Sequence, residues 1–207
     1  MKLIKSQVVF NPDEHTYMLG DKELSGITSV IGRHLFPDKY RDVPEDVLRK
    51  AAERGTMIHS ICELVDDMGI THDSDEAQGY KELKDDWGLR YECSEYLVSD
   101  NEHYASCIDK VYRENDTDFT LGDIKTTYVL DKESVRWQLS IYAYLFELQN
   151  PGCNAVRLIG IWLRGKNHEI VEVERIPSEV VMNLLKCDSE GRQFVNPYSI
   201  SPVTLPD

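Results

Sequence analysis

The middle of the chain carries strand-like runs that are followed by one long apolar helix pattern and a further strand. The runs cover Tyr91–Val98, Tyr104–Tyr112 and Phe119–Thr127, and the breaks between them are rich in turn-forming residues. Short breaks of this kind favour an antiparallel meander. A helix over Ser134–Gln149 then carries the chain to a strand at Ala155–Leu163. This order predicts an α/β fold with a mixed central β-sheet flanked by helices.

The flanking segments predict smaller elements. Residues 1–26 are expected to hold a hairpin or small meander, with strand-like runs at Val8–Phe10, His15–Leu19 and Lys22–Leu24 and turns at Asn11–Glu14 and Gly20–Asp21. Near the other end, Glu169–Val173 is expected to pair with the preceding strand. Pro177 is expected to begin a last amphipathic helix, and the proline-containing tail from Asn196 is expected to be extended.

Three further helices are predicted before the meander. Thr28 and Ser29 are expected to cap a short helix that ends before Pro37. Pro44 opens a longer helix, with a break near Arg54–Gly55 and an end at Gly69. The polar segment from Asp73 to Trp87 is expected to be helical as well.

Composition indicates an ordinary globular protein in a reducing compartment. The 207 residues are 41% apolar and 29% charged, which suits one domain with a substantial core. The cysteines are odd in number, and none forms a CxxC pair, so disulfide frameworks and zinc ribbons are not expected. No stretch approaches the ~20 apolar residues of a membrane span, and no apolar leader is visible. We therefore expect a cytoplasmic protein that does not enter membranes.

The net charge of −14 restricts how the chain can meet nucleic acid. Proteins that coat long nucleic acids are expected to be basic. An acidic protein can still cut DNA if it touches few phosphates and if metal ions supply local positive charge. The same charge leaves open an acidic protein that mimics DNA.

Two acidic strand segments provide the strongest chemical signal. Asp123 and Lys125 lie at i and i+2 of one strand and so point to one face, and Asp109 lies on the strand before it. Each group alone is consistent with a solvated strand or a simple ion pair. Together they place two carboxylates and an ammonium in a buried sheet, beside the Ile124 carbonyl as a further hard oxygen ligand. This set suits phosphodiester hydrolysis by a metal-activated water.

Two helical pairs add to this set. His59 and Glu63 lie at i and i+4, so they share a helix face. A surface pair is one interpretation; the other is an imidazole ligand that favours Mn²⁺, with Glu63 serving a second metal or its water. Gln138 and Tyr142 have the same spacing on the helix after the Asp–Lys strand. They are expected either to pack in the core or to bond the scissile phosphate or the metal-bearing strand.

The order of these residues resembles the PD-(D/E)XK nucleases of the RecB and phage exonuclease type. The series reads Gly55-x3-His59-x3-Glu63, Asp109, Asp123-x-Lys125-Thr126 and Gln138-x3-Tyr142. The resemblance implies a restriction-endonuclease-like core, with residues 1–207 as one nuclease domain and the catalytic motifs over about residues 54–142. It implies Mg²⁺ or Mn²⁺ held by His59, Asp109, Asp123 and the Ile124 carbonyl. Lys125 would act on the water or the developing charge, and Gln138 and Tyr142 would position the phosphate.

The resemblance further implies a deoxyribonuclease that acts on linear DNA ends in phage-type recombination or repair. An endonuclease of the same fold is the alternative, followed by an inactive DNA-binding relative and the DNA mimic. A single-strand annealing protein is an implied partner. Polarity, strand preference and a homo-oligomeric state stay open. Some relatives hold an iron–sulfur cluster, but only Cys153 and Cys187 follow the core, so no such cluster is expected here.

A basic cluster and a set of aromatic residues are two further candidates for contacts with nucleic acid. Arg33, His34, Lys39 and Arg41 form the main basic cluster early in the chain, and a solvated face is the favoured interpretation. Trp137, Tyr144 and Trp162 offer rings for base stacking, but packing in or near the core is favoured.

Overall fold

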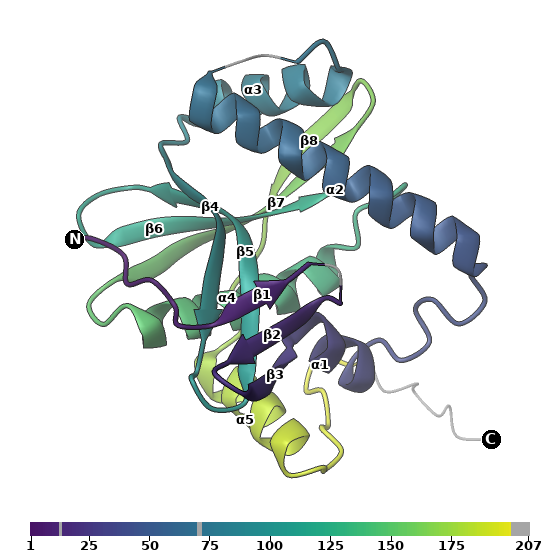
Figure 1. The fold of residues 1–207 in the computed structure, drawn as a ribbon, viewed down its shortest axis with the longest axis vertical. Helices are drawn as coiled ribbons and strands as arrows, with labels where there is room; N and C mark the ends of the chain where they lie inside the picture. The colour runs from purple at the N-terminus through teal and green to yellow at the C-terminus, as the bar shows by residue number, and fades with distance from the viewer. Residues whose placement is uncertain (13, 70–71, 200–207) are drawn as a thin grey trace, which may run out of the picture.

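A mixed eight-stranded sheet forms the centre of the protein, with helices on both of its faces (Figure 1). The computed structural model describes residues 1–12, 14–69 and 72–199. The sheet follows the order β1-β2-β3-β5-β6-β7-β8, and β4 pairs with β5 beside this path. The predicted α/β architecture with a mixed sheet and flanking helices is therefore confirmed. No helix in the described part of the chain is long and apolar enough to cross a membrane.

The predicted meander and crossover form the middle of this sheet. Strands β4 (Tyr91–Ser99), β5 (Tyr104–Arg113) and β6 (Asp118–Lys125) pair antiparallel in sequence order. Helix α4 (Lys132–Gln149) then returns the chain so that β7 (Asn154–Arg164) lies parallel to β6. Strand β8, over Asn167–Glu172, pairs antiparallel with β7 as expected.

The N-terminal hairpin joins the sheet at an unusual place. Strands β1 (Val9–Asn11), β2 (Thr16–Leu19) and β3 (Lys22–Gly26) form an antiparallel meander, and the predicted turn before β2 includes residue 13, which lies outside the described residues. The end of β3 then pairs parallel with the start of β5, with Ser25 opposite Tyr104.

Strands β3 and β6 share one edge of β5, because β4 occupies the other edge along almost its full length. β3 pairs with Tyr104 and Ala105, whereas β6 pairs only from Lys110 onward. Within the described residues, the stretch from Ser106 to Asp109 has no strand partner on that edge. We call this opening the fork. Figure 1 shows β5 and β6 running in clearly different directions away from their shared segment.

The helices around the sheet cover the predicted segments, but two predicted details of α1 and α2 are wrong. Helix α1 (Ile27–His34) begins directly after β3 with Gly26 as its N-cap, so the predicted cap by Thr28 and Ser29 is wrong and both residues lie inside the helix. Helix α2 (Glu45–Met68) is continuous, so the predicted break near Arg54–Gly55 is also wrong.

Tertiary contacts explain why α2 does not break. Arg54 donates a hydrogen bond to the Thr126 carbonyl oxygen at 3.0 Å and another to Glu76 at 2.6 Å. A Cβ built on Gly55 would lie 3.7 Å from the Thr126 hydroxyl, which is an ordinary contact distance, so the helix passes close to this loop without steric conflict. The hydrogen bonds of Arg54 therefore hold the middle of the helix in place. Gly69 ends the helix in a left-handed conformation with φ 62°, as predicted.

Two apolar clusters fill the two faces of the sheet. The larger one joins the sheet to α1, α4 and α5 (Ser178–Ser189), and it includes the fully buried Trp137, which confirms the packing interpretation of that residue. The second one lies under α2 and α3 (Asp75–Trp87). Part of the tail that was expected to be extended, residues 200–207, lies outside the described residues.

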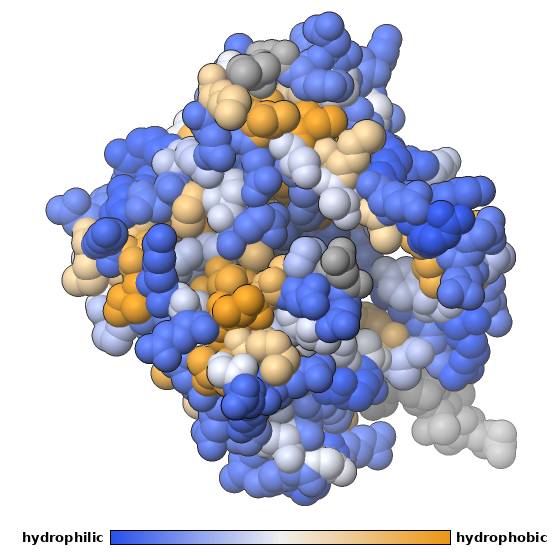
Figure 2. Space-filling view, viewed as in Figure 1, coloured by the Kyte–Doolittle hydropathy of each residue, from blue (hydrophilic) through white to orange (hydrophobic). Residues whose placement is uncertain are grey.

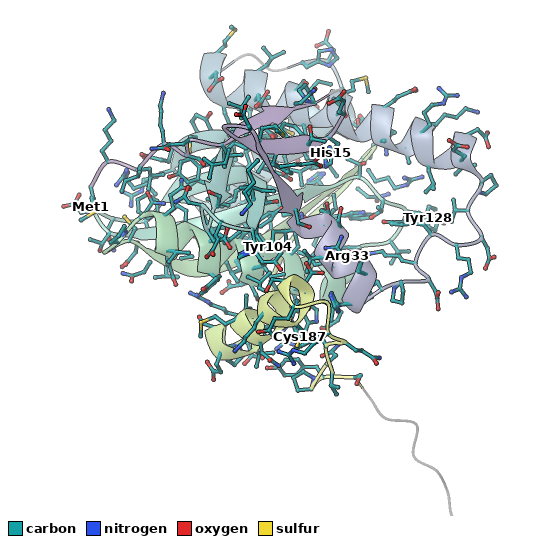
Figure 3. The ribbon with its side chains drawn as sticks, turned by 60° about the horizontal axis from the view of Figure 1, so that its bottom comes forward. Met1, His15, Arg33, Tyr104, Tyr128 and Cys187 are labelled. Atoms are coloured by element: carbon teal, nitrogen blue, oxygen red, sulfur yellow. The ribbon has the colours of Figure 1, made fainter. Side chains whose placement is uncertain are left out.

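The early basic cluster is neutralised by carboxylates instead of forming a free positive face. The Asp188 carboxylate of α5 accepts hydrogen bonds from two nitrogens of Arg33 at 2.9 and 3.0 Å. It also lies 2.9 Å from His34 Nε2 and accepts a hydrogen bond from the Tyr104 hydroxyl at 3.1 Å. Figure 3 shows Arg33 and Tyr104 beside the helix that carries Cys187, which is α5. Burial raises the pKa of Asp188, but the hydrogen bonds from Arg33 and His34 outweigh it and the pKa is lowered. These contacts fasten α5 to α1 and β5.

Candidate metal centre

The sequence-predicted site residues all line one cavity of about 530 Å³. The cavity lies between α2 and the N-terminal hairpin, above the fork in the sheet, and Figure 2 shows the surface recessed there. Its walls include His59, Glu63, Asp109, Asp123, Ile124, Lys125, Gln138 and Tyr142, together with hairpin residues Phe10, Pro12, His15 and Tyr17. The fold therefore brings together segments that are far apart in the sequence.

One side of the cavity carries a close group of potential metal ligands. His59 of α2, Glu95 of β4 and Asp109 of β5 each offer one ligand atom, and these atoms lie within 4.8 Å of one another. His59 Nε2 lies 3.8 Å from Asp109 Oδ2, and His59 Nδ1 lies 3.7 Å from Glu95 Oε1. An imidazole with two carboxylates suits Mn²⁺ or Mg²⁺ better than it suits a soft metal.

Glu95 belongs to this group, although no sequence motif points to it. In the β4–β5 register, Ser94 lies opposite Lys110 and Tyr96 opposite Ile108, so Glu95 lies opposite Asp109. Its φ of 47° is left-handed, which is unusual for a glutamate within a strand. An acidic residue in an alternating strand normally indicates a solvent face. The pairing register is the only signal that would have placed Glu95 beside Asp109.

The charges in this group act on one another. Burial raises the pKa of Asp109 to about 6, although the neighbouring His59 opposes that change. Burial lowers the pKa of His59, but the charges of Asp109 and Glu95 outweigh it and raise that pKa to about 9. Without a metal ion, the imidazole is therefore cationic at neutral pH and balances the two acids.

Asp109 also supports the backbone of the neighbouring strand. Its Oδ2 accepts a hydrogen bond from the Ile124 amide at 2.6 Å, at the point where β6 has left β5. The carboxylate thus spans the fork where a backbone ladder would otherwise run. This contact holds the β6 backbone in place at the residue between Asp123 and Lys125.

The other side of the cavity is a connected set of side chains from β6 and α4. Lys125 Nζ lies 2.8 Å from Asp123 Oδ2 and donates to Gln138 Oε1 at 3.0 Å. Gln138 Nε2 lies 2.7 Å from Asp123 Oδ1 and 2.6 Å from the Tyr142 hydroxyl. The predicted shared face of Asp123 and Lys125 is therefore present. In this arrangement Gln138 bonds both Asp123 and Lys125, and Tyr142 bonds Gln138.

The electrostatics of this second set favour an ion pair and a neutral phenol. Burial lowers the pKa of Lys125, but Asp123 and Asp109 outweigh it, so the pKa is raised and the amine stays charged. Burial raises the pKa of Tyr142 well above its usual value. Asp123 Oδ2 is buried and forms the ion pair with Lys125 at 2.8 Å, but it accepts no well-aligned hydrogen bond from any described residue. A metal ion beside the ligand set across the cavity would share this oxygen with the Lys125 ammonium.

Glu63 lines the same cavity but stands apart from the close ligand group. Burial and the nearby Glu95 charge raise its pKa. His59 is paired with Glu95 and Asp109, whereas Glu63, one helical turn later, lines the cavity outside this group.

The loop after Lys125 is held from three directions. Arg54 and Arg164 donate to the Thr126 carbonyl oxygen at 3.0 and 3.1 Å. The Trp162 indole donates to the Thr127 carbonyl oxygen at 2.8 Å. Trp162 therefore anchors the loop that positions Lys125. Tyr128, the next residue, is 79% exposed, and Figure 3 shows it below the N-terminal half of α2.

Comparisons with known proteins bear on the fold alone. No protein-family model matches the chain, and no curated protein matches it. Among solved structures, the crystal structure of SSO0001 aligns with a TM-score of 0.50 at 15% sequence identity, covering 84% of this chain and 78% of that chain. At this identity the likeness supports a shared α/β architecture.

Proposed function

We propose that this protein is a metal-dependent deoxyribonuclease with a restriction-endonuclease-like PD-(D/E)XK core. One observation carries the proposal: residues from α2, β5, β6 and α4 that match the motif order all line a single cavity. The Asp123–Lys125 contact at 2.8 Å and the nearby ligand group supply the acids and the cation that phosphodiester hydrolysis needs.

A divalent ion would be held by His59, Glu95 and Asp109, with Asp123 and the Ile124 carbonyl as further oxygen donors. Glu95 is added to the ligand set that the sequence implies. When bound, Mg²⁺ or Mn²⁺ would supply Lewis-acid stabilisation of the phosphate and lower the pKa of a coordinated water.

The chain's own residues would orient the reacting groups. The Lys125 ammonium faces the cavity beside Asp123, where it would stabilise negative charge that builds on the phosphate. Gln138 fixes both Asp123 and Lys125, and the neutral Tyr142 hydroxyl fixes Gln138. We therefore assign Gln138 and Tyr142 as positioning residues. Asp109 keeps β6 in place through the Ile124 amide.

Within this proposal we favour an exonuclease that acts on linear DNA ends, because the Gln138-x3-Tyr142 helix resembles that of RecB-type enzymes. The association with recombination or repair, and with a single-strand annealing protein, rests on the same resemblance.

The test is a cleavage time course with end-labelled linear duplex, closed circular duplex and single-stranded DNA, each with Mg²⁺, Mn²⁺ or EDTA. Lys125→Met and Asp123→Asn should lose cleavage, while Lys186→Met, at a 66% exposed lysine of α5, should match the wild type. Loss of linear but not circular DNA establishes the exonuclease, and cutting of circles establishes an endonuclease instead. No cleavage with any metal ion would refute both forms of the proposal.

A further inference from the structure

A second cavity of about 390 Å³ adjoins the candidate metal centre. It lies between α1, the segment that follows α1, the loop after Lys125 and the start of α4. Thr28, Lys125 and Gln138 line both cavities, so the two are continuous at the proposed reactive lysine. The proposed reaction gives no role to this second cavity.

The wall of the second cavity is mainly apolar and aromatic. Aliphatic side chains form its floor and sides, namely Ile31, Val43, Val129 and Val135. The Lys39 ammonium lies 5.4 Å from the Phe36 ring centre and 5.8 Å from that of Tyr40, and it pairs with Asp131 at 2.7 Å. Tyr40 is 55% exposed. The cavity thus combines flat rings with a fixed cation, and its volume lies within the range of small-molecule sites.

Gly32 borders this open space from inside α1. A Cβ built on Gly32 would meet no atom within 4 Å, and the residue lines the cavity. The helix surface is therefore open at this point, so a flat group from outside the chain has room against it. A large side chain at position 32 would fill the same space.

Resting on the proposed nuclease function, we infer that the second cavity holds an unpaired nucleobase of the strand being cut, next to the scissile phosphate. A phosphate at Lys125 would place its neighbouring nucleosides on the two sides of that residue. The metal side presents the carboxylates of Glu63 and Glu95, whereas the other side presents rings and aliphatic walls. Bases stack on aromatic faces, and only an unpaired base can leave its partner to do so. The substrate class is therefore DNA with an unpaired end or single-stranded DNA.

The test places a leucine side chain into the open space. Gly32→Leu should fill the cavity and Tyr40→Ala should remove one ring. Ser29→Leu, at an exposed residue of the same helix that does not line the cavity, is the matched control. The probe is a single-stranded oligonucleotide with 2-aminopurine as the base beside the first cleavable phosphodiester. Its fluorescence is titrated in EDTA, so the signal does not depend on catalysis. Thermal melts verify that each variant is folded.

We expect the wild type and Ser29→Leu to quench 2-aminopurine. Gly32→Leu and Tyr40→Ala should bind about tenfold more weakly, within the range that one stacked base contributes. An abasic oligonucleotide should bind all four proteins alike. If the wild type cuts DNA but the folded Gly32→Leu and Tyr40→Ala variants bind and cut single strands as the wild type does, the base site is wrong and the nuclease stands. If the wild type cuts no DNA, the proposed function itself fails.

Discussion

The buried carboxylate of Asp66 should be one of the most important side chains for the stability of this protein. Its side chain has no exposed surface, and it accepts hydrogen bonds from Lys110 Nζ at 2.7 Å and the Tyr80 hydroxyl at 2.8 Å, besides contacting Lys84 Nζ. Lys110 is itself only 1% exposed and also donates to Ser94 at 2.7 Å. One aspartate of α2 therefore pairs with two lysines under the helix.

Asp66→Asn should destabilise the protein by about 3–5 kcal/mol, because it leaves the buried Lys110 ammonium without a carboxylate. Lys84 is 16% exposed and can turn toward water, so we expect a value near the lower end. For a chain of this size, about 3 kcal/mol corresponds to a fall of roughly 10 °C in Tm.

Urea and thermal unfolding, followed by circular dichroism, measure this difference. Asp67→Asn on the same helix is the matched control, since its bond to the Tyr91 hydroxyl is exposed and should contribute less than about 1 kcal/mol. Adding Lys110→Met to Asp66→Asn should recover part of the lost stability, because the unpaired charge is removed. A loss below about 1 kcal/mol for Asp66→Asn would refute this reasoning.

Three further outcomes follow from contacts described above. Glu95→Ala should weaken Mn²⁺ binding measured by isothermal titration calorimetry, and an unchanged affinity would remove Glu95 from the ligand set. Asp188→Asn should lower Tm at pH 7; because the folded pKa of Asp188 lies below its usual 3.8, the difference should shrink as pH falls below that value, and a constant difference in Tm would contradict the ion-pair role. Gly79→Ala should lower Tm, because a Cβ there would lie 2.6 Å from His168 Nδ1, and a Tm equal to the wild type would show that His168 moves freely.

Sequence patterns predicted the parts of the fold in which segments pack against their neighbours in the sequence. The meander from β4 to β6 and the crossover through α4 are sequence-local, so turn residues and apolar periodicity sufficed to predict them. The pairing of Ser25 with Tyr104 is not local, and nothing in either segment specifies the other. The middle of α2 is held by the bond from Arg54 to Thr126, a residue far along the chain, so the helix continues through a glycine that looked like a break.

The residues of the candidate site also divide into those that local spacing predicts and those that depend on tertiary packing. His59, Asp109, Asp123 and Lys125 could be predicted because each pair or run has a spacing that fixes its face. Glu95 could not, because its place depends on strand register and on a left-handed φ. The orientation of Gln138 toward Asp123 also depends on how α4 packs on the sheet, which helical spacing does not determine.

The fork in the sheet has a consequence for the order in which the protein folds. During synthesis the hairpin is made before β5, yet its docking strand pairs with β5 roughly eighty residues later. Closing so long a loop is slow compared with forming the local β4–β6 meander. The Asp109 bridge to Ile124 can form within that meander, whereas the hairpin wall of the cavity arrives afterwards. The ligand-bearing floor should therefore exist before the cavity is enclosed, and a nascent chain would reach a closed centre only when the hairpin docks on β5.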